Sequence, residues 1–143
     1  MYQEPARYVV PLQRCSVTQC RLDYGFVLII NGEDDDAFEL RIEQPFVLAL
    51  AVAGLEVRLD PQGDPTALAP ALSLLHADLV DATAFEDGRL VVRFAGGNEL
   101  RVSSSGDYQA WTFAGPYGLR VVSIPGGELR IWQPDGAARA QPA

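Results

Sequence analysis

Short turns built on glycine recur at regular intervals along the second half of this chain, and they limit its fold more than any other feature. The turn pairs are Asp87-Gly88, Gly96-Gly97, Ser105-Gly106, Gly115-Pro116 and Gly126-Gly127. Glycine supplies the positive φ that tight hairpin turns require. Short apolar or alternating runs lie between the turns, and this spacing is typical of an antiparallel meander.

The first half of the chain has a similar pattern. Residues 37–43 alternate between apolar and charged side chains, which predicts a strand with one buried face. Residues 26–30 and 46–52 are apolar on both faces, which predicts buried strands. The predicted strands cover residues 17–22, 26–30, 37–43, 46–52, 55–59, 80–85, 89–95, 99–103, 110–113, 119–124 and 128–132.

One segment between these halves carries helical signals. Asp64 can cap a helix, and Pro65 suits the first helical position, where no N–H partner is needed. Three leucines at i, i+4 and i+7 form one apolar stripe: Leu68, Leu72 and Leu75. The sequence therefore predicts one α-helix near residues 65–76, lying across a sheet.

The predicted fold class is α+β. It is mostly antiparallel β-structure in two meanders, with about ten short strands and one packed α-helix. The order of strands and turns before the helix resembles the order after it, and a Glu-Leu-Arg string occurs in both halves. A duplication explains this likeness, but so does the general need of antiparallel strands for paired outward charges. A single domain over residues 1–143 is expected, with a disordered tail from about residue 134.

Charge restricts the possible partners. The chain has 19 acidic and 11 basic residues, a net charge of −8, and every basic residue is Arg. This balance argues against duplex DNA and anionic membranes, since both favour basic surfaces. Most of the Arg side chains fall at outward strand positions, where we expect them to pair with acidic neighbours.

No targeting or membrane segment is predicted. The first ten residues lack a basic stretch followed by an apolar run. The longest apolar stretch, residues 46–54, is far shorter than the ~20 residues of a spanning helix. A cytoplasmic location is therefore expected. Cys15 and Cys20 are predicted to be free thiols on opposite faces of a strand, and neither a metal nor a cofactor is expected.

Two segments are candidate binding sites. The densest acidic run includes Asp34, Asp35 and Asp36, and it is either a solvated hairpin loop or a surface for a basic partner. The second segment concentrates aromatic residues around turns and supplies Asp107, Tyr108, Trp111 and Tyr117. Tyr and Trp are common at interface hot spots, yet they also fill the edge of a small core, so both interpretations remain open.

Catalytic patterns are weak. A catalytic role for the single His76 would need a nucleophile or a carboxylate aimed at it. Its position near the end of the predicted helix offers a structural account instead, because partial positive charge there complements the helix dipole. Asp23, Asp87 or Asp107 could act as acid or base only if two carboxylates shared a pocket. We therefore expect that the protein is not an enzyme.

Several short strings together resemble a known family. They are Leu22-Asp23-Tyr24, Leu40-Arg41-Ile42-Glu43 with Pro45-Phe46, Asp60-Pro61 through Asp64-Pro65, Ala84-Phe85-Glu86-Asp87-Gly88, Asp107-Tyr108 with Trp111, Gly115-Pro116 with Gly118-Leu119, and Pro125-Gly126-Gly127. The chain resembles, over residues 12–132, small bacterial proteins that carry a domain of unknown function and are most common in GC-rich actinobacteria. The resemblance implies a compact domain and supplies no activity, cofactor or catalytic residue.

Two functions follow as hypotheses. The first is a small acidic interaction protein, such as an immunity-type protein that binds a basic bacterial toxin. The alternative is a small-ligand binding module with a cleft between the two meanders, lined by Tyr108, Trp111 and Tyr117. The oligomeric state is open, because either the helix or a second copy of the chain, in a homodimer, could cover the apolar strands at residues 26–30 and 46–52.

Overall fold

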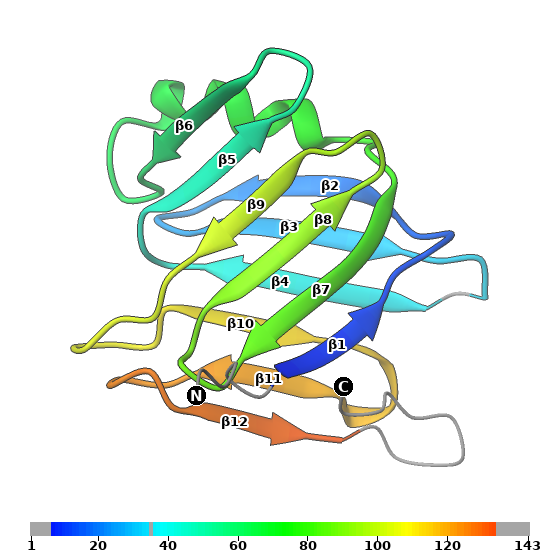
Figure 1. The fold of residues 1–143 in the computed structure, drawn as a ribbon, viewed down its shortest axis with the longest axis vertical. Coiled ribbons are helices and arrows are strands. Elements are labelled where there is room, and N and C mark those ends of the chain that lie inside the picture. The colour runs from blue at the N-terminus through cyan, green and yellow to red at the C-terminus, as the bar shows by residue number, and fades with distance from the viewer. Residues whose placement is uncertain (1–6, 35, 134–143) are drawn as a thin grey trace, which may run out of the picture.

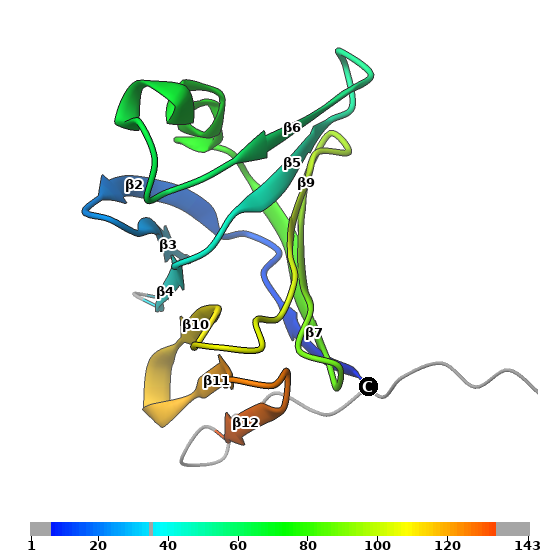
Figure 2. The same cartoon turned by 90° about the vertical axis from the view of Figure 1, so that its left-hand side faces the viewer.

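The computed structural model describes residues 7–34 and 36–133. Two six-stranded antiparallel sheets face each other, and their strands cross at a steep angle (Figures 1 and 2). The core lies between the inner faces of the sheets. The expected tail from about residue 134 lies outside the described residues. No helix in the described part of the chain is long and apolar enough to cross a membrane.

Each sheet has a simple strand order. Sheet A contains, from edge to edge, β1 (Arg7–Pro11), β7 (Leu79–Phe85), β8 (Leu90–Phe94), β9 (Glu99–Val102), β5 (Phe46–Leu50) and β6 (Leu55–Leu59). Sheet B contains β12 (Leu129–Trp132), β11 (Arg120–Ser123), β10 (Trp111–Ala114), β4 (Ala37–Ile42), β3 (Phe26–Asn31) and β2 (Ser16–Leu22). The antiparallel strands predicted from the turn spacing are thus confirmed, while β1 was missed.

The division into one meander before the helix and one after it is wrong. β5 and β6 precede the helix but join sheet A, where Leu48 of β5 lies opposite Leu100 of β9. β10 follows the helix but joins sheet B, where its Phe113 lies opposite Leu40 of β4. All four of these side chains are buried. Each sheet therefore contains strands from both sides of the helix in the sequence, and buried apolar pairs such as these join them.

The predicted α-helix is instead a 3₁₀-helix, η1 (Pro65–Leu74). Asp64 caps it as expected, because its Oδ1 accepts a hydrogen bond from the Thr66 backbone N–H at 3.0 Å. A 3₁₀-helix has three residues per turn, so the buried side chains recur at that interval: Leu68, Ala71 and Leu74. Of the predicted stripe, Leu72 and Leu75 are 45% and 41% exposed.

Proline accounts for the change of helix type. Pro70 lies inside η1. Proline has no N–H to donate, and its ring clashes with the carbonyl one turn earlier in an α-helix. The segment therefore continues in tighter turns. η1 contacts both β6 and β2, which are the edge strands of the two sheets on that side.

The two sheets are joined by aromatic packing. Phe26 of sheet B stacks on Phe46 of sheet A with ring centroids 5.4 Å apart, and both are buried. Outside the core, the predicted pairing of outward Arg residues is found: the Arg93 Nε donates to Asp81 at 2.9 Å, and Arg101 pairs with Glu56 and Glu99. These pairs reduce the charge that the sheet faces present to solvent.

Candidate functional site

The turns of sheet B gather at its two ends, and one end collects acidic residues. The β3–β4 loop lies at this end, because β3 finishes and β4 begins there. β10 pairs antiparallel with β4 and therefore runs parallel to β3, so the turn after β10 also lies at this end. Figure 1 shows both turns on the right. We call this surface, formed by residues 32–34, 36 and 115–118, the acidic end.

The carboxylates of the acidic end are poorly neutralised. Glu33 and Asp34 are exposed, and Asp36 is half-buried. The Glu33 carboxylate lies 3.8 Å from Arg14, but both side chains are largely exposed, so water screens the pair. Within residues 7–34 and 36–133, no ion pair involves Asp34 or Asp36. Asp35 lies outside the described residues.

Tyr117 adds an aromatic side chain to the same end. It is 63% exposed and lies in the turn between β10 and β11, with φ at 61°. A positive φ is unusual for a bulky residue and costs free energy. The turn is anchored by Gly115, where any Cβ would lie 2.8 Å from the Phe38 ring of β4. Close packing of this turn on β4 therefore fixes the tyrosine at the same end of sheet B as the acidic loop.

A buried thiol lies beneath the acidic loop. Cys15 is buried and free. Burial raises the pKa of its thiol, and the negative charges of Asp36 and Glu33 raise that pKa further. The thiol packs against this loop, because a Cβ added at Gly32 would lie 3.1 Å from the Cys15 Sγ.

The predicted aromatic segment does not form one site. Trp111 is fully buried, and its Nε1 donates to the Gly88 carbonyl oxygen at 2.9 Å, so it belongs to the core. Asp107 and Tyr108 are exposed in the loop before β10, whereas Tyr117 follows β10. They lie at opposite ends of that strand, because the chain crosses sheet B between them (Figure 1).

The expected ligand cleft between Tyr108, Trp111 and Tyr117 is therefore absent from the described structure. Trp111 instead lines an interior hollow between the sheets, together with Tyr8 and Phe113. Its volume is about 10 Å³, which is no larger than the space for one water molecule.

Two of the three carboxylates considered for acid–base chemistry accept hydrogen bonds from arginine side chains. Asp23 accepts a hydrogen bond from Arg41 at 3.0 Å, and Asp87 accepts one from Arg89 at 2.8 Å. Asp107 is exposed. No hydrogen bond among the described residues joins any two of these carboxylates.

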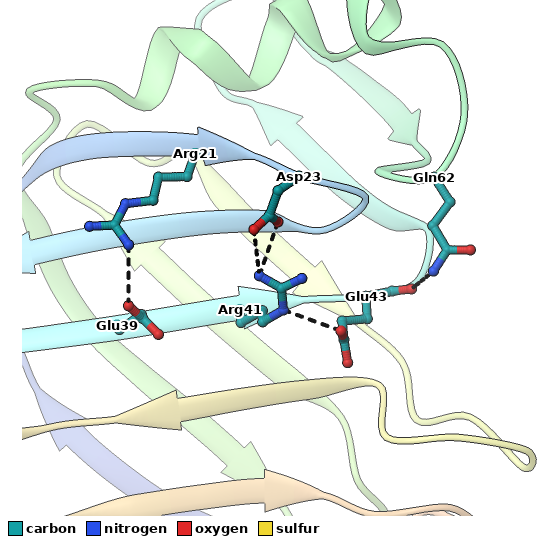
Figure 3. Close-up of polar contacts among 6 residues, drawn as sticks. All are labelled: Arg21, Asp23, Glu39, Arg41, Glu43 and Gln62. Atoms are coloured by element: carbon teal, nitrogen blue, oxygen red, sulfur yellow. Dashed lines mark hydrogen bonds and ion pairs between the residues drawn. The ribbon is translucent and has the colours of Figure 1, made fainter.

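Other acidic side chains of sheet B are closely paired, in contrast to the acidic end. On the outer face, Arg41 lies between Asp23 and Glu43, and Arg21 lies 3.9 Å from Glu39 (Figure 3). Burial alone would lower the pKa of Arg41, but its hydrogen bonds to Glu43 and Asp23 outweigh that effect and raise the pKa. This face therefore offers little free charge to a partner.

No group of three or more His, Cys, Asp or Glu side chains that could hold a metal ion occurs within the described residues. His76 is exposed after η1, and its backbone N–H donates to the Val17 carbonyl oxygen at 2.8 Å.

The hairpin tip after β5 is exposed, although the sequence predicts a buried strand there. The predicted buried strand at residues 46–52 ends at Leu50, and Val52 is 100% exposed at the hairpin tip that follows. The glycine at position 54 was a sequence signal for this turn, because glycine within an apolar run often marks a turn. In the structure Gly54 has a φ of 63°.

Comparison with known proteins places the chain in a family but supplies no activity. No curated protein and no solved structure matches it. Residues 8–133 match a family described as "Family of unknown function (DUF6188)". This match covers nearly the whole chain and confirms the resemblance to a family of unknown function: the protein is a member of the DUF6188 family.

Proposed function

We propose that this protein is a non-enzymatic binding protein whose acidic end engages a basic surface on another protein. One observation carries the proposal: Asp34 and Asp36, which have no ion pair among the described residues, and a strained, exposed tyrosine lie at the same end of sheet B. Negative potential speeds and orients the approach of a basic partner, and a rigid tyrosine provides contact area at small entropic cost.

The class of partner follows from this chemistry. A protein that presents Lys or Arg around a shallow pocket for one aromatic ring fits the acidic end. An immunity-type role, in which the chain neutralises a basic bacterial toxin, is the specific form that we favour. A cytoplasmic location suits this role, because it keeps the two free thiols reduced.

Binding to a purified candidate tests the proposal, with the basic product of a neighbouring gene as the first choice. We expect Asp34→Arg combined with Asp36→Arg to weaken binding at least tenfold, and Tyr117→Ala to weaken it by a similar factor. The matched control is Glu86→Arg with Asp107→Arg, which changes the net charge equally at two exposed positions away from the acidic end. Equal loss of binding in both double variants would show that only net charge matters, and would contradict a specific site.

A further inference from the structure

The hairpin between β5 and β6 ends in an apolar tip. Residues 50–55 read Leu-Ala-Val-Ala-Gly-Leu and include no polar side chain. Val52 is 100% exposed and Leu55 is 52% exposed. Hairpin tips usually carry polar turn residues, so an exposed apolar tip needs an explanation. In Figures 1 and 2 this hairpin extends beyond the rest of sheet A.

A second turn supports the tip and is also uncharged. The β8–β9 turn, residues 95–98, reads Ala-Gly-Gly-Asn. The Asn98 Oδ1 accepts a hydrogen bond from the Ala51 backbone N–H at 2.9 Å. Gly97 packs so closely that a Cβ there would lie 3.1 Å from the Ala51 Cβ. We call residues 50–55 and 95–98 together the neutral tip; it is braced in one conformation before any contact is made.

A shallow hollow with a mixed polar and apolar lining adjoins the tip, since Ala51 and Gly54 are among its lining residues. It has a volume of about 250 Å³, and its apolar lining includes Ala49, Leu50, Leu55 and Gly97. Its rim carries Glu56, Glu99 and Arg101. The arginine pairs with both carboxylates, at 2.9 Å and 3.0 Å, which leaves one net negative charge on this rim.

We propose that the neutral tip is the contact between two copies of this chain, with the Val52 side chain of each copy entering the hollow of the other. A two-fold contact requires one patch that is complementary to itself, and a projecting side chain next to a hollow provides this. Each copy carries a net charge of −8, so electrostatic repulsion opposes a contact between two copies least where the surface has no charged side chain. The neutral tip is such a surface.

Alternative occupants fit the tip less well. A bilayer would require basic or aromatic residues around the apolar side chains, and the rim of the hollow carries two Glu and one Arg instead. A few apolar side chains make a small interface, so the dimer is expected to be weak and reversible. Salt should strengthen it by screening the repulsion between the two acidic copies, whereas salt should weaken binding of a basic partner at the acidic end. The two proposals can therefore fail independently.

Sedimentation velocity of the full chain, from low micromolar to millimolar concentration, tests the inference. We expect reversible dimers that become more abundant with added NaCl, and a rise in the dimer Kd of roughly tenfold or more in Val52→Asp. Ala49→Leu, which fills the hollow without changing charge, should weaken the dimer as well. The matched control is Tyr24→Asp, since Tyr24 is 83% exposed on a hairpin of the other sheet and the charge change is the same.

Three outcomes would overturn the inference. The first is a monomer at every concentration and salt concentration. The second is a dimer that Val52→Asp and Tyr24→Asp weaken equally. The third is Val52-dependent binding to phosphatidylcholine vesicles by a chain that stays monomeric, which would assign the tip to a bilayer.

Discussion

The indole Nε1 of Trp111 donates a hydrogen bond to the carbonyl oxygen of Gly88 at 2.9 Å, and this bond joins the two sheets. Trp111 begins β10 in sheet B, and Gly88 lies in the β7–β8 turn of sheet A. Both residues are buried. The most distinctive aromatic residue of the sequence therefore connects the layers of the fold and contributes nothing to the surface.

Replacement of Trp111 should destabilise the protein strongly. Trp111→Phe removes the indole donor, leaves the Gly88 carbonyl without that partner and opens a cavity, which together should cost about 2–4 kcal/mol of unfolding free energy. Urea denaturation followed by circular dichroism measures the loss. Trp132→Phe is the control, because Trp132 is 51% exposed and should change stability by less than about 0.5 kcal/mol. Similar losses in the two variants would contradict the assignment of Trp111 to the core.

Gly88 should tolerate no side chain. Its φ is 92°, and an added Cβ would lie 2.5 Å from the Gly127 carbonyl oxygen and 2.6 Å from the Ser104 Cβ. Gly96 has nearly the same φ, 91°, but no atom lies within 4 Å of its added Cβ. Gly88→Ala should therefore lower the melting temperature much more than Gly96→Ala, which pays only a backbone cost of about 1–3 kcal/mol. Equal stability of the Gly88→Ala and Gly96→Ala variants would show that Gly88 does not pack this closely against Ser104 and Gly127.

The buried side of η1 can be tested by alanine substitution. Leu68→Ala and Leu74→Ala should each cost about 2–5 kcal/mol, because both leucines are 1% exposed. Leu72→Ala and Leu75→Ala should cost well under about 1 kcal/mol. Chemical denaturation of the four variants decides between the two helix types. Large losses at Leu72 and Leu75 would restore the α-helical stripe that the sequence predicts.

The local parts of this fold were predictable, and the distant pairings were not. Strand positions follow from alternation and turn residues, so β4 and β9 lie within a residue or two of their predicted ranges. The pairing of β5 with β9 and of β4 with β10 joins segments far apart in the sequence, and no local pattern specifies it. The helix type was missed because leucines at i, i+4 and i+7 fit an α-helix, while the effect of Pro70 on its geometry depends on packing.

The candidate site was only partly predictable for the same reason. The acidic loop and Tyr117 were each singled out from composition. Their location at the same end of sheet B depends on the β4–β10 pairing, which brings the turn after β10 to the end where β3 finishes. The separation of Tyr108 from Tyr117 follows from the same pairing, since β10 runs between them.

Ionisation of buried groups should lower stability at alkaline pH. The pKa values of Cys15, Cys20 and Tyr8 are all raised by burial. Above the ordinary thiol pKa of 9.0, unfolded chains lose protons that folded chains retain, so the free energy of unfolding should fall as pH rises. Urea denaturation at a series of pH values should show a shallower fall in Cys15→Ala than in the unmodified chain.

The pKa of the Cys15 thiol reports on the negative charge at the acidic end. Because Asp36 raises the pKa of Cys15, Asp36→Asn should move the titration midpoint of the Cys15 Cβ chemical shift to lower pH. Asp60→Asn, on a different loop, should leave it in place. Equal midpoints in both variants would mean that the acidic end carries no significant local potential.

Site-specific photo-crosslinking in cells tests the central claim, binding through the acidic end, most directly. A photoreactive residue replaces either Tyr117 at this end or Tyr24 on the hairpin at the other end of sheet B, where the tyrosine is also exposed. The account predicts one dominant product at position 117, formed with a protein whose contact surface is basic, and loss of that product when Asp34→Arg and Asp36→Arg are added. No product at position 117, or the same product from both positions, would contradict it.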